Sequence, residues 1–289
     1  GRNRATSTLS KITEVTGNFL RFLRFAIIHL RRKALAPSWR SENVEEGCAK
    51  KFLIASLFYP FSFNNGKYMD PYFKDLHNHL KKQGFYCQYV SDCLTAPSKD
   101  IQRNVQDCKE VDVITPHGLI SWIELLAIVM RVFVRKLYFR HPVTFMGCDL
   151  TRLIQWNAHR YQFDFNTSSE IYYQAVSNIT EKVKFDKLLV IYEGNVFERA
   201  CIQAFRRHSG NQVNAYSHAV IFPLLSIKLY MSDREKYLRP EPDYFVCSGE
   251  RERNLLVNIG KRNPARIITA CALRVIPREQ KSDQTTILV

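Results

Sequence analysis

A glutamate follows directly after the most apolar strand-like run of the chain. Residues 187–192 are rich in leucine, isoleucine and valine, and Glu193 is the next residue. A carboxylate at the end of a buried strand is partly desolvated, which raises its pKa and suits it to act as a general base. An acidic residue can also lie near a pocket without taking part in chemistry, so both interpretations of Glu193 stay open.

Asn195 and Glu198 come next, with the spacing of a helix capping box. In that arrangement Asn is the N-cap and Glu, at the third helical position, reaches back to the free backbone N–H groups. Contact with a substrate is the alternative role for these two residues.

A histidine, His218, follows the next β-rich run at residues 213–217. A histidine there can move a proton or donate a hydrogen bond to a phosphate or sugar oxygen. The alternative is a histidine whose ring is satisfied by a nearby backbone group. We take Glu193 and His218 as the candidate catalytic residues.

Polar residues also flank the last two predicted strands. Asp243 precedes residues 244–247 and Ser248-Gly249 follows them, while Arg274 stands shortly after residues 266–270. These residues, with Asn195 and Glu198, are candidates for substrate binding. Asp243 can instead bond its own turn, Ser248 can cap a helix, and Arg274 can pair with a carboxylate of a neighbouring domain as well as with phosphate.

The elements that carry these residues alternate between strand and helix. Short β-rich runs alternate with helical stretches, which predicts a Rossmann-like α/β fold: a doubly wound parallel sheet with helices on both faces. In such sheets ligands bind beyond the carboxyl ends of the strands, where most of the candidates stand. The predicted strands are residues 51–59, 85–90, 111–115, 187–192, 213–217, 244–247 and 266–270, and the predicted helices are 70–84, 119–139, 150–187, 196–208 and 251–259.

A separate segment, residues 1–50, precedes this pattern. Residues 1–16 are polar and predicted to be loose, and residues 19–35 have an apolar stripe at helical spacing together with arginines. This basic amphipathic helix can lie in an anionic membrane interface or dock on its own domain. The longest apolar stretch, residues 119–134, is too short to span a bilayer.

Composition limits the classes of partner. Lys and Arg outnumber Asp and Glu by 42 to 27, so the chain favours anionic partners. We expect no specific nucleic acid, because no DNA- or RNA-binding motif is present, and no cofactor or metal, because G-x-G-x-x-G, P-loop and C-x-x-C patterns are missing. The eight cysteines fit free thiols in a reducing cytoplasm.

An ordered set of short motifs resembles bacterial surface-carbohydrate and O-antigen biosynthesis proteins, which are glycosyltransferases of the GT-B architecture. Upstream, Phe58-Tyr59-Pro60 and the segment 68–80 resemble the aromatic loop and first helix of that family. The main motifs are Tyr192-Glu193-x-Asn195-x-x-Glu198, Ala215-Tyr216-Ser217-His218, Pro240-x-Pro242-Asp243, Ser248-Gly249 and Ala272-Leu273-Arg274.

The resemblance implies a two-domain enzyme whose N-terminal half, the acceptor side, is this chain. A sugar would pass from a nucleotide sugar to a lipid-linked or saccharide acceptor. Glu193 would act as general base, His218 near the donor phosphate or acceptor, and Arg274 on the leaving phosphate. The enzyme would be cytoplasmic, with peripheral contact to an anionic inner membrane.

This assignment fixes the expected domains and leaves alternatives. The Rossmann-like acceptor domain is predicted at residues 51–280, and residues 281–289 are predicted to be a linker and the first strand of a truncated C-terminal domain. A teichoic-acid-type polyol-phosphate transferase and a non-catalytic carbohydrate-binding or assembly module are the alternatives.

Overall fold

The computed structural model describes residues 2–39, 50–64, 66–95, 98–108, 110–135, 142–155, 166–217 and 240–270. Two of the candidate site residues, His218 and Arg274, lie outside these ranges, as do residues 281–289, the predicted start of a further domain.

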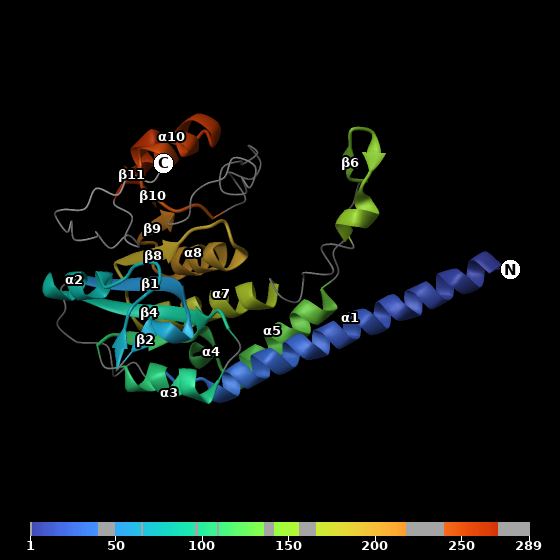
Figure 1. Ribbon diagram of the computed structural model, residues 1–289, viewed down its shortest axis with the longest axis horizontal. Helices are drawn as coiled ribbons and strands as arrows, with labels where there is room; N and C mark the ends of the chain where they lie inside the picture. The colour runs from blue at the N-terminus through green and yellow to red at the C-terminus, as the bar shows by residue number, and fades with distance from the viewer. Residues whose placement is uncertain are drawn as a thin grey trace, which may run out of the picture.

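A seven-stranded sheet forms the centre of the molecule (Figure 1), and all its strand pairs are parallel. Each strand contains or overlaps one of the predicted runs, so the predicted α/β class with a parallel, Rossmann-like sheet is confirmed. The strands are β1 (Lys50–Phe58), β4 (Phe85–Cys93), β5 (Asp112–Ile114), β8 (Lys187–Ile191), β9 (Gln212–Ser217), β10 (Tyr244–Cys247) and β11 (Ile267–Thr269).

The strand order places a topological switch point beside β1. The order is β11-β10-β9-β8-β1-β4-β5, so the chain proceeds from β1 to β4 and β5 on one side and then returns to β8 on the other. At such a point the connections on either side leave in opposite directions, which opens a crevice at the carboxyl ends of the strands. The fold therefore places a crevice beyond β1, β4 and β8.

Both faces of the sheet are buried, which explains the continuous apolar run of β1. Leu53 and Ala55 belong to one core, and Ile54 and Phe58 to the other. The first core is covered by α4 (Pro116–Leu119), α5 (Trp122–Val134), α7 (Thr167–Lys182) and α8 (Val196–His208). The second is covered by α2 (Leu76–Lys82) and α3 (Lys99–Asp107).

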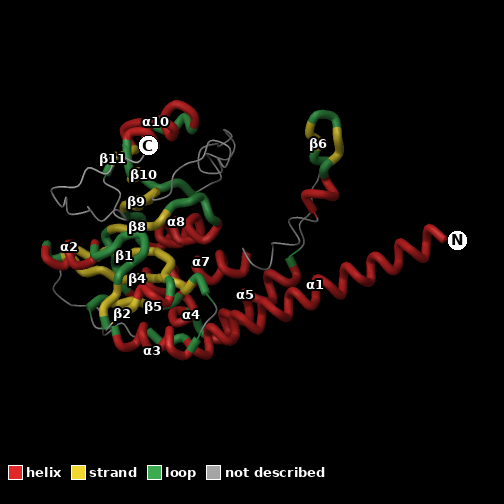
Figure 2. Tube along the Cα trace, viewed as in Figure 1, coloured by secondary structure: helices red, strands yellow, loops and turns green. Residues whose placement is uncertain are grey.

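The first helix, α1 (Arg2–Leu35), is longer than predicted, because residues 2–16 are helical rather than loose. Its N-terminal half extends beyond the rest of the described chain (Figure 1), and Figure 2 shows it as one unbroken helix. Its C-terminal half packs on the domain through Phe22, Phe25, Ala26 and Leu30.

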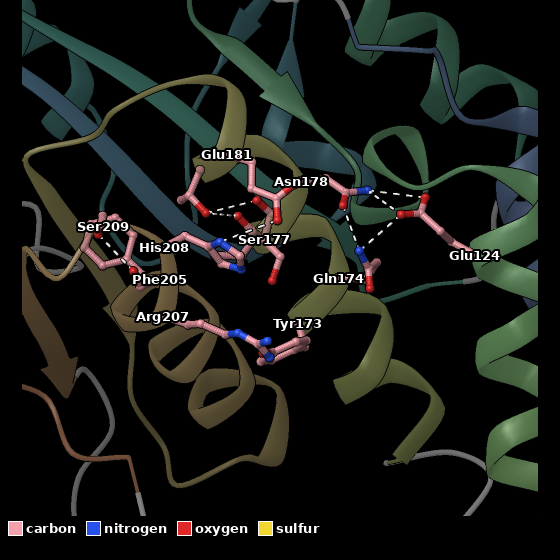
Figure 3. Close-up of polar contacts among 12 residues, drawn as sticks. Glu124, Tyr173, Gln174, Ser177, Asn178, Glu181, Phe205, Arg207, His208 and Ser209 are labelled. Atoms are coloured by element: carbon pink, nitrogen blue, oxygen red, sulfur yellow. Dashed lines mark hydrogen bonds and ion pairs between the residues drawn. The ribbon is translucent and has the colours of Figure 1, made fainter.

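Polar contacts hold α7 between its neighbouring helices (Figure 3). Gln174 and Asn178 donate hydrogen bonds to Glu124 of α5, each at 3.1 Å. On the other side, Arg207 of α8 donates to the hydroxyl of Tyr173 at 3.0 Å. These bonds tie the middle of α7 to α5 and to the C-terminal turn of α8.

The predicted helix 70–84 begins later than expected. Asp70 is fully buried and its carboxylate accepts hydrogen bonds from the Ser56 hydroxyl (2.6 Å), the Tyr68 hydroxyl (2.9 Å) and the backbone N–H groups of Tyr72 and Phe73. Because these bonds close a turn, the helix α2 starts only at Leu76.

Other helix boundaries also differ from the predictions. The predicted helix 119–139 is two helices, α4 and α5, because Ser121 starts a new helix with a capping box to Glu124. The helix 251–259 is α10 (Glu250–Asn254) continued by a π-turn (Leu255–Ile259), and α3, capped by Ser98, was not predicted. The described ranges also contain two hairpins and two short helices. One hairpin joins β2 (Phe63–Asn64) to β3 (Lys67–Tyr68), and the other joins β6 (Thr144–Phe145) to β7 (Cys148–Asp149). The short helices are Pro60–Ser62 and Pro264–Arg266.

Candidate functional site

A cavity of about 550 Å³ opens at the carboxyl ends of β1, β4 and β8. This is the crevice that the strand order places beside β1. Its walls come from the loops after these strands, from the first turns of α7 and α8 and from α1. The lining residues are Arg32, Leu57, Tyr59, Tyr72, Asp92, Cys93, Leu94, Ser168, Ser169, Tyr172, Glu193, Asn195, Val196 and Phe197.

The predicted base Glu193 lines this cavity and is half-buried. Its backbone N–H donates to both carboxylate oxygens of Glu198, at 2.9 and 3.0 Å. The loop between β8 and α8 is thereby held in place, and Glu193 stands at the entrance of a partly enclosed site. A carboxylate in this position can accept a proton from a bound hydroxyl group.

Glu198 is fully buried beneath this loop. Besides Glu193, its carboxylate accepts the backbone N–H of Gly194 (2.8 Å), the backbone N–H of Asn195 (2.9 Å) and the Asn195 side-chain amide (3.0 Å). Burial raises the pKa of Glu198 to about 7, against the lowering effect of these hydrogen bonds. Asn195 and Glu198 form the capping box that the sequence indicated. Of the two, Asn195 also lines the cavity, whereas Glu198 acts on the site through the loop that it holds.

The opposite wall carries an ion pair. Arg32, near the end of α1, pairs with Asp92 at the carboxyl end of β4. A second guanidinium N–H of Arg32 donates to the carbonyl oxygen of Cys93 at 3.4 Å. Arg32 and Asp92 are both mostly buried. The helix α1 therefore contributes a cation to the cavity wall.

Aromatic rings form much of the remaining wall. Tyr59 follows β1 and stacks on Phe61, with ring centroids 5.0 Å apart. Tyr72 is fixed by its backbone hydrogen bond to the buried Asp70 at 2.7 Å. Flat apolar rings beside polar groups are a surface on which a sugar ring can lie while its hydroxyl groups are bonded from the side.

The N-termini of α7 and α8 both reach the cavity. Ser168 and Ser169 belong to the first turn of α7, and Val196 and Phe197 to the first turn of α8. Helix N-termini carry partial positive charge and free N–H groups, which favour anions. These helix ends are the parts of the wall that favour an anion, whereas its charged side chains are one cation, Arg32, which pairs with Asp92, and the carboxylate of Glu193.

Asp243 lies at the amino ends of the strands, whereas the cavity lies at their carboxyl ends. It precedes β10, and its carboxylate accepts the backbone N–H of Val213 at 2.8 Å and a guanidinium N–H of Arg206 at 2.9 Å. Both interactions lie at the amino ends of β9 and β10, so the structure does not bring Asp243 together with Glu193.

Ser248 and Gly249 lie at the carboxyl end of β10, where the polar groups of Ser248 bond the buried carboxylate of Glu252. The backbone N–H and hydroxyl of Ser248 donate to Glu252 at 3.0 and 3.1 Å, and Ser217 bonds the other oxygen of Glu252. The cap of α10 is Gly249, so Ser248 is not the helix cap that the sequence suggested. A buried glutamate thus holds this loop as Glu198 holds the one after β8.

Arg32 and Asp92 were missed by sequence reasoning. The strand at residues 85–90 was ended too early, which hid that Asp92 stands at the carboxyl end of β4. Arg32 was interpreted only as part of a basic helix face. A signal existed for Asp92, since it is a carboxylate shortly after an apolar run, as Glu193 is.

No group of three His, Cys, Asp or Glu side chains within the described ranges is arranged to hold a metal ion. No protein-family model matches the chain, and none of the curated proteins is significantly similar to it.

Proposed function

We propose that this chain is the acceptor-side α/β domain of a glycosyltransferase-like protein of bacterial surface polysaccharide biosynthesis. A sugar passes from a nucleotide-activated donor to a lipid-linked or saccharide acceptor. The observation that carries this proposal is the position of Glu193, half-buried in an open cavity at the switch point of a parallel sheet.

In the proposed reaction the acceptor hydroxyl oxygen attacks the anomeric carbon of the donor sugar. The new carbon–oxygen bond forms as the bond to the donor phosphate breaks, and the electron pair leaves with the phosphate. Glu193 takes the hydroxyl proton, which increases the nucleophilicity of the oxygen as the bond forms. Asn195 and the phenol groups of the wall orient the acceptor ring.

The N-termini of α7 and α8 at the cavity wall support an acceptor that carries phosphate. Arg32, which pairs with Asp92, can also donate to a lipid-linked phosphate beside Glu193. In the GT-B arrangement that the sequence motifs suggest, the nucleotide is bound mainly by a second α/β domain. His218 and Arg274 are then proposed to contact the donor and leaving phosphates.

Sugar transfer by the native protein that carries this chain tests the proposal. Glu193→Gln keeps the shape of the side chain and removes the base, so kcat should fall by about 10²- to 10⁴-fold with little change in acceptor binding. The matched control is Glu250→Gln, a carboxylate that is exposed and outside the cavity. Unchanged turnover in Glu193→Gln, or an equal loss in the control, contradicts the role of Glu193.

A panel of donors separates the reaction classes. Transfer from nucleotide sugars supports the proposal, whereas transfer from a nucleotide-activated polyol identifies a teichoic-acid-type transferase. Acceptor binding that depends on the cavity, without turnover of any donor, identifies a carbohydrate-binding module.

A further inference from the structure

The exposed side of α5 is almost wholly apolar. Ile123 is 80 % exposed and Val134 is 64 % exposed, although both are large hydrophobic residues. Trp122, Leu126 and Met130 of the same helix are also exposed. The opposite side of the same helix, including Leu125 and Ile128, fills the core. Core packing therefore explains only one of the two apolar faces of this helix.

The helix α1 repeats the same arrangement. Phe22 and Ala26 pack on the domain, while Leu20 is 60 % and Ile27 is 62 % exposed. Leu20 and Ile27 are seven residues apart and lie on one stripe of the helix, with Leu23 beside them. An apolar stripe turned away from the core has no role in holding this helix to its own domain.

The two helices pack against each other, so their exposed residues form one surface. The rings of Phe22 and Phe133 lie 4.2 Å apart, and α5 lies along the C-terminal half of α1 (Figure 1). We name the exposed residues Leu20, Leu23, Ile27, Trp122, Ile123, Leu126 and Met130 the two-helix surface. Contiguous apolar surfaces of this kind on a folded domain mark binding sites.

The charged residues beside the two-helix surface indicate what binds to it. Arg21, Arg24 and Arg31 of α1 are exposed, whereas Arg131 and Arg135 at the end of α5 pair with Glu170 at 2.9 and 3.3 Å. Residues 17–35 contain no acidic residue, and the acidic residue of α5, Glu124, is turned toward Gln174 and Asn178. Apolar residues beside the exposed arginines of α1 match the boundary between lipid tails and anionic headgroups.

We infer that the two-helix surface docks on an anionic lipid bilayer, with α1 and α5 lying in the plane of the interface. No helix in the described part of the chain is long and apolar enough to cross a membrane, and docking requires no crossing. The inference rests on the exposed residues alone and does not depend on the proposed sugar transfer.

The helix that carries the docking stripe also contributes to the cavity wall. Arg32 lies five residues beyond Ile27 on α1 and lines the cavity.

Co-sedimentation with vesicles tests the inference on the whole chain. The probe is phosphatidylcholine vesicles with and without phosphatidylglycerol. We expect binding only to the anionic vesicles, and about a tenfold or greater loss of affinity for Ile27→Glu with Ile123→Glu. Removing arginines by Arg21→Gln or Arg24→Gln should weaken binding about fivefold each. Ile268→Glu, an exposed apolar residue of β11, is the matched control and should bind like the wild type.

A fluorescence measurement tests docking on the wild-type protein, so that its result does not depend on whether a variant folds. Trp122 is exposed in the free protein, so vesicles should shift the emission to shorter wavelength, and Trp122→Phe should remove most of that shift. Equal binding by the wild type and the double variant, both with native thermal unfolding, overturns the inference. Wild-type dimers that the double substitution dissociates, with no vesicle binding, would instead identify a contact between two copies of the chain.

Discussion

Arg32 of α1 and Asp92 of β4 form an ion pair at the carboxyl end of the sheet. Arg32 also bonds the carbonyl oxygen of Cys93, so one side chain ties the first helix to the strand that follows β1 in the sheet. The pair joins two features of the molecule. It lies in the wall of the cavity, and it lies one turn of α1 from the exposed stripe that includes Ile27.

Breaking this pair should destabilise the fold. Arg32→Ala leaves Asp92, whose side chain is only 15 % exposed, without its partner, and we expect a loss of about 1–3 kcal/mol in the free energy of unfolding. Denaturant unfolding of Arg32→Ala, Asp92→Ala and the double variant measures the coupling energy between the two residues. Arg24→Ala, an exposed arginine of the same helix, should change stability by no more than about 0.5 kcal/mol. A coupling energy near zero would show that α1 is held by its apolar face alone.

The buried carboxylate of Glu198 should be the main support of the loop between β8 and α8. Glu198→Ala leaves the N–H groups of Glu193, Gly194 and Asn195 without their acceptor and opens a cavity, so we expect a loss of about 3–5 kcal/mol. Chemical denaturation checks the magnitude, and hydrogen exchange of these three amides checks the location. The control is Glu181→Ala on α7, where the side chain is 58 % exposed and the expected loss is small. Slow exchange of the loop amides in Glu198→Ala would contradict this support.

The framework of the fold could be predicted from the sequence because it depends on local patterns. Runs such as residues 188–192 are apolar throughout, since strands of a parallel sheet are buried on both faces. Glu193 and the capping box of Asn195 with Glu198 followed from their places beside such a run. These positions are fixed within a few residues of the chain.

The features that the sequence did not predict depend on partners that are distant in sequence or on side-chain burial. Asp70 resembles a helix cap until its bond to Ser56, in the middle of β1, is known. Arg32 enters the site only because α1 folds back over the carboxyl end of β4. Asp243 stands next to a strand, as Glu193 does, but at its amino end, and the pairing with Val213 fixes it there.

The position of Asp243 leads to a prediction that separates stability from activity. Asp243→Ala removes the acceptor of the Val213 N–H and the partner of Arg206, so stability should fall by about 1–2 kcal/mol. Acceptor binding and turnover per folded molecule should not change. Asp243 lies at the amino end of β10, whereas the cavity lies at the carboxyl ends of the strands. Thermal unfolding and the transfer assay measure the two quantities side by side. A large loss of turnover at unchanged stability would place Asp243 in the site.

The buried histidine pair between α1 and α4 should make the protein sensitive to acid. His29 Nδ1 and His117 Nε2 lie 3.1 Å apart, and both side chains are almost fully buried. Burial, followed by the charge of His117 and Arg32 on His29 and of Arg32 and Lys33 on His117, lowers the pKa of each imidazole from 6.5 to about 3. Asp92 opposes this shift at His29 and does not reverse it.

Between these two pKa values the unfolded chain binds protons that the folded chain does not, so stability falls as the pH is lowered from 6.5 toward 3. Each histidine contributes about 1.4 kcal/mol per pH unit in this window. His117→Gln keeps a hydrogen-bonding group beside His29 and removes one titrating ring. Its free energy of unfolding should therefore depend less steeply on pH than that of the wild type, by about 1.4 kcal/mol per unit. His79→Gln, at an exposed histidine of α2, is the matched control for replacing a histidine by glutamine. Parallel pH profiles for the wild type and His117→Gln, or an NMR titration of the His117 ring near pH 6.5 in the folded protein, would contradict a neutral buried pair.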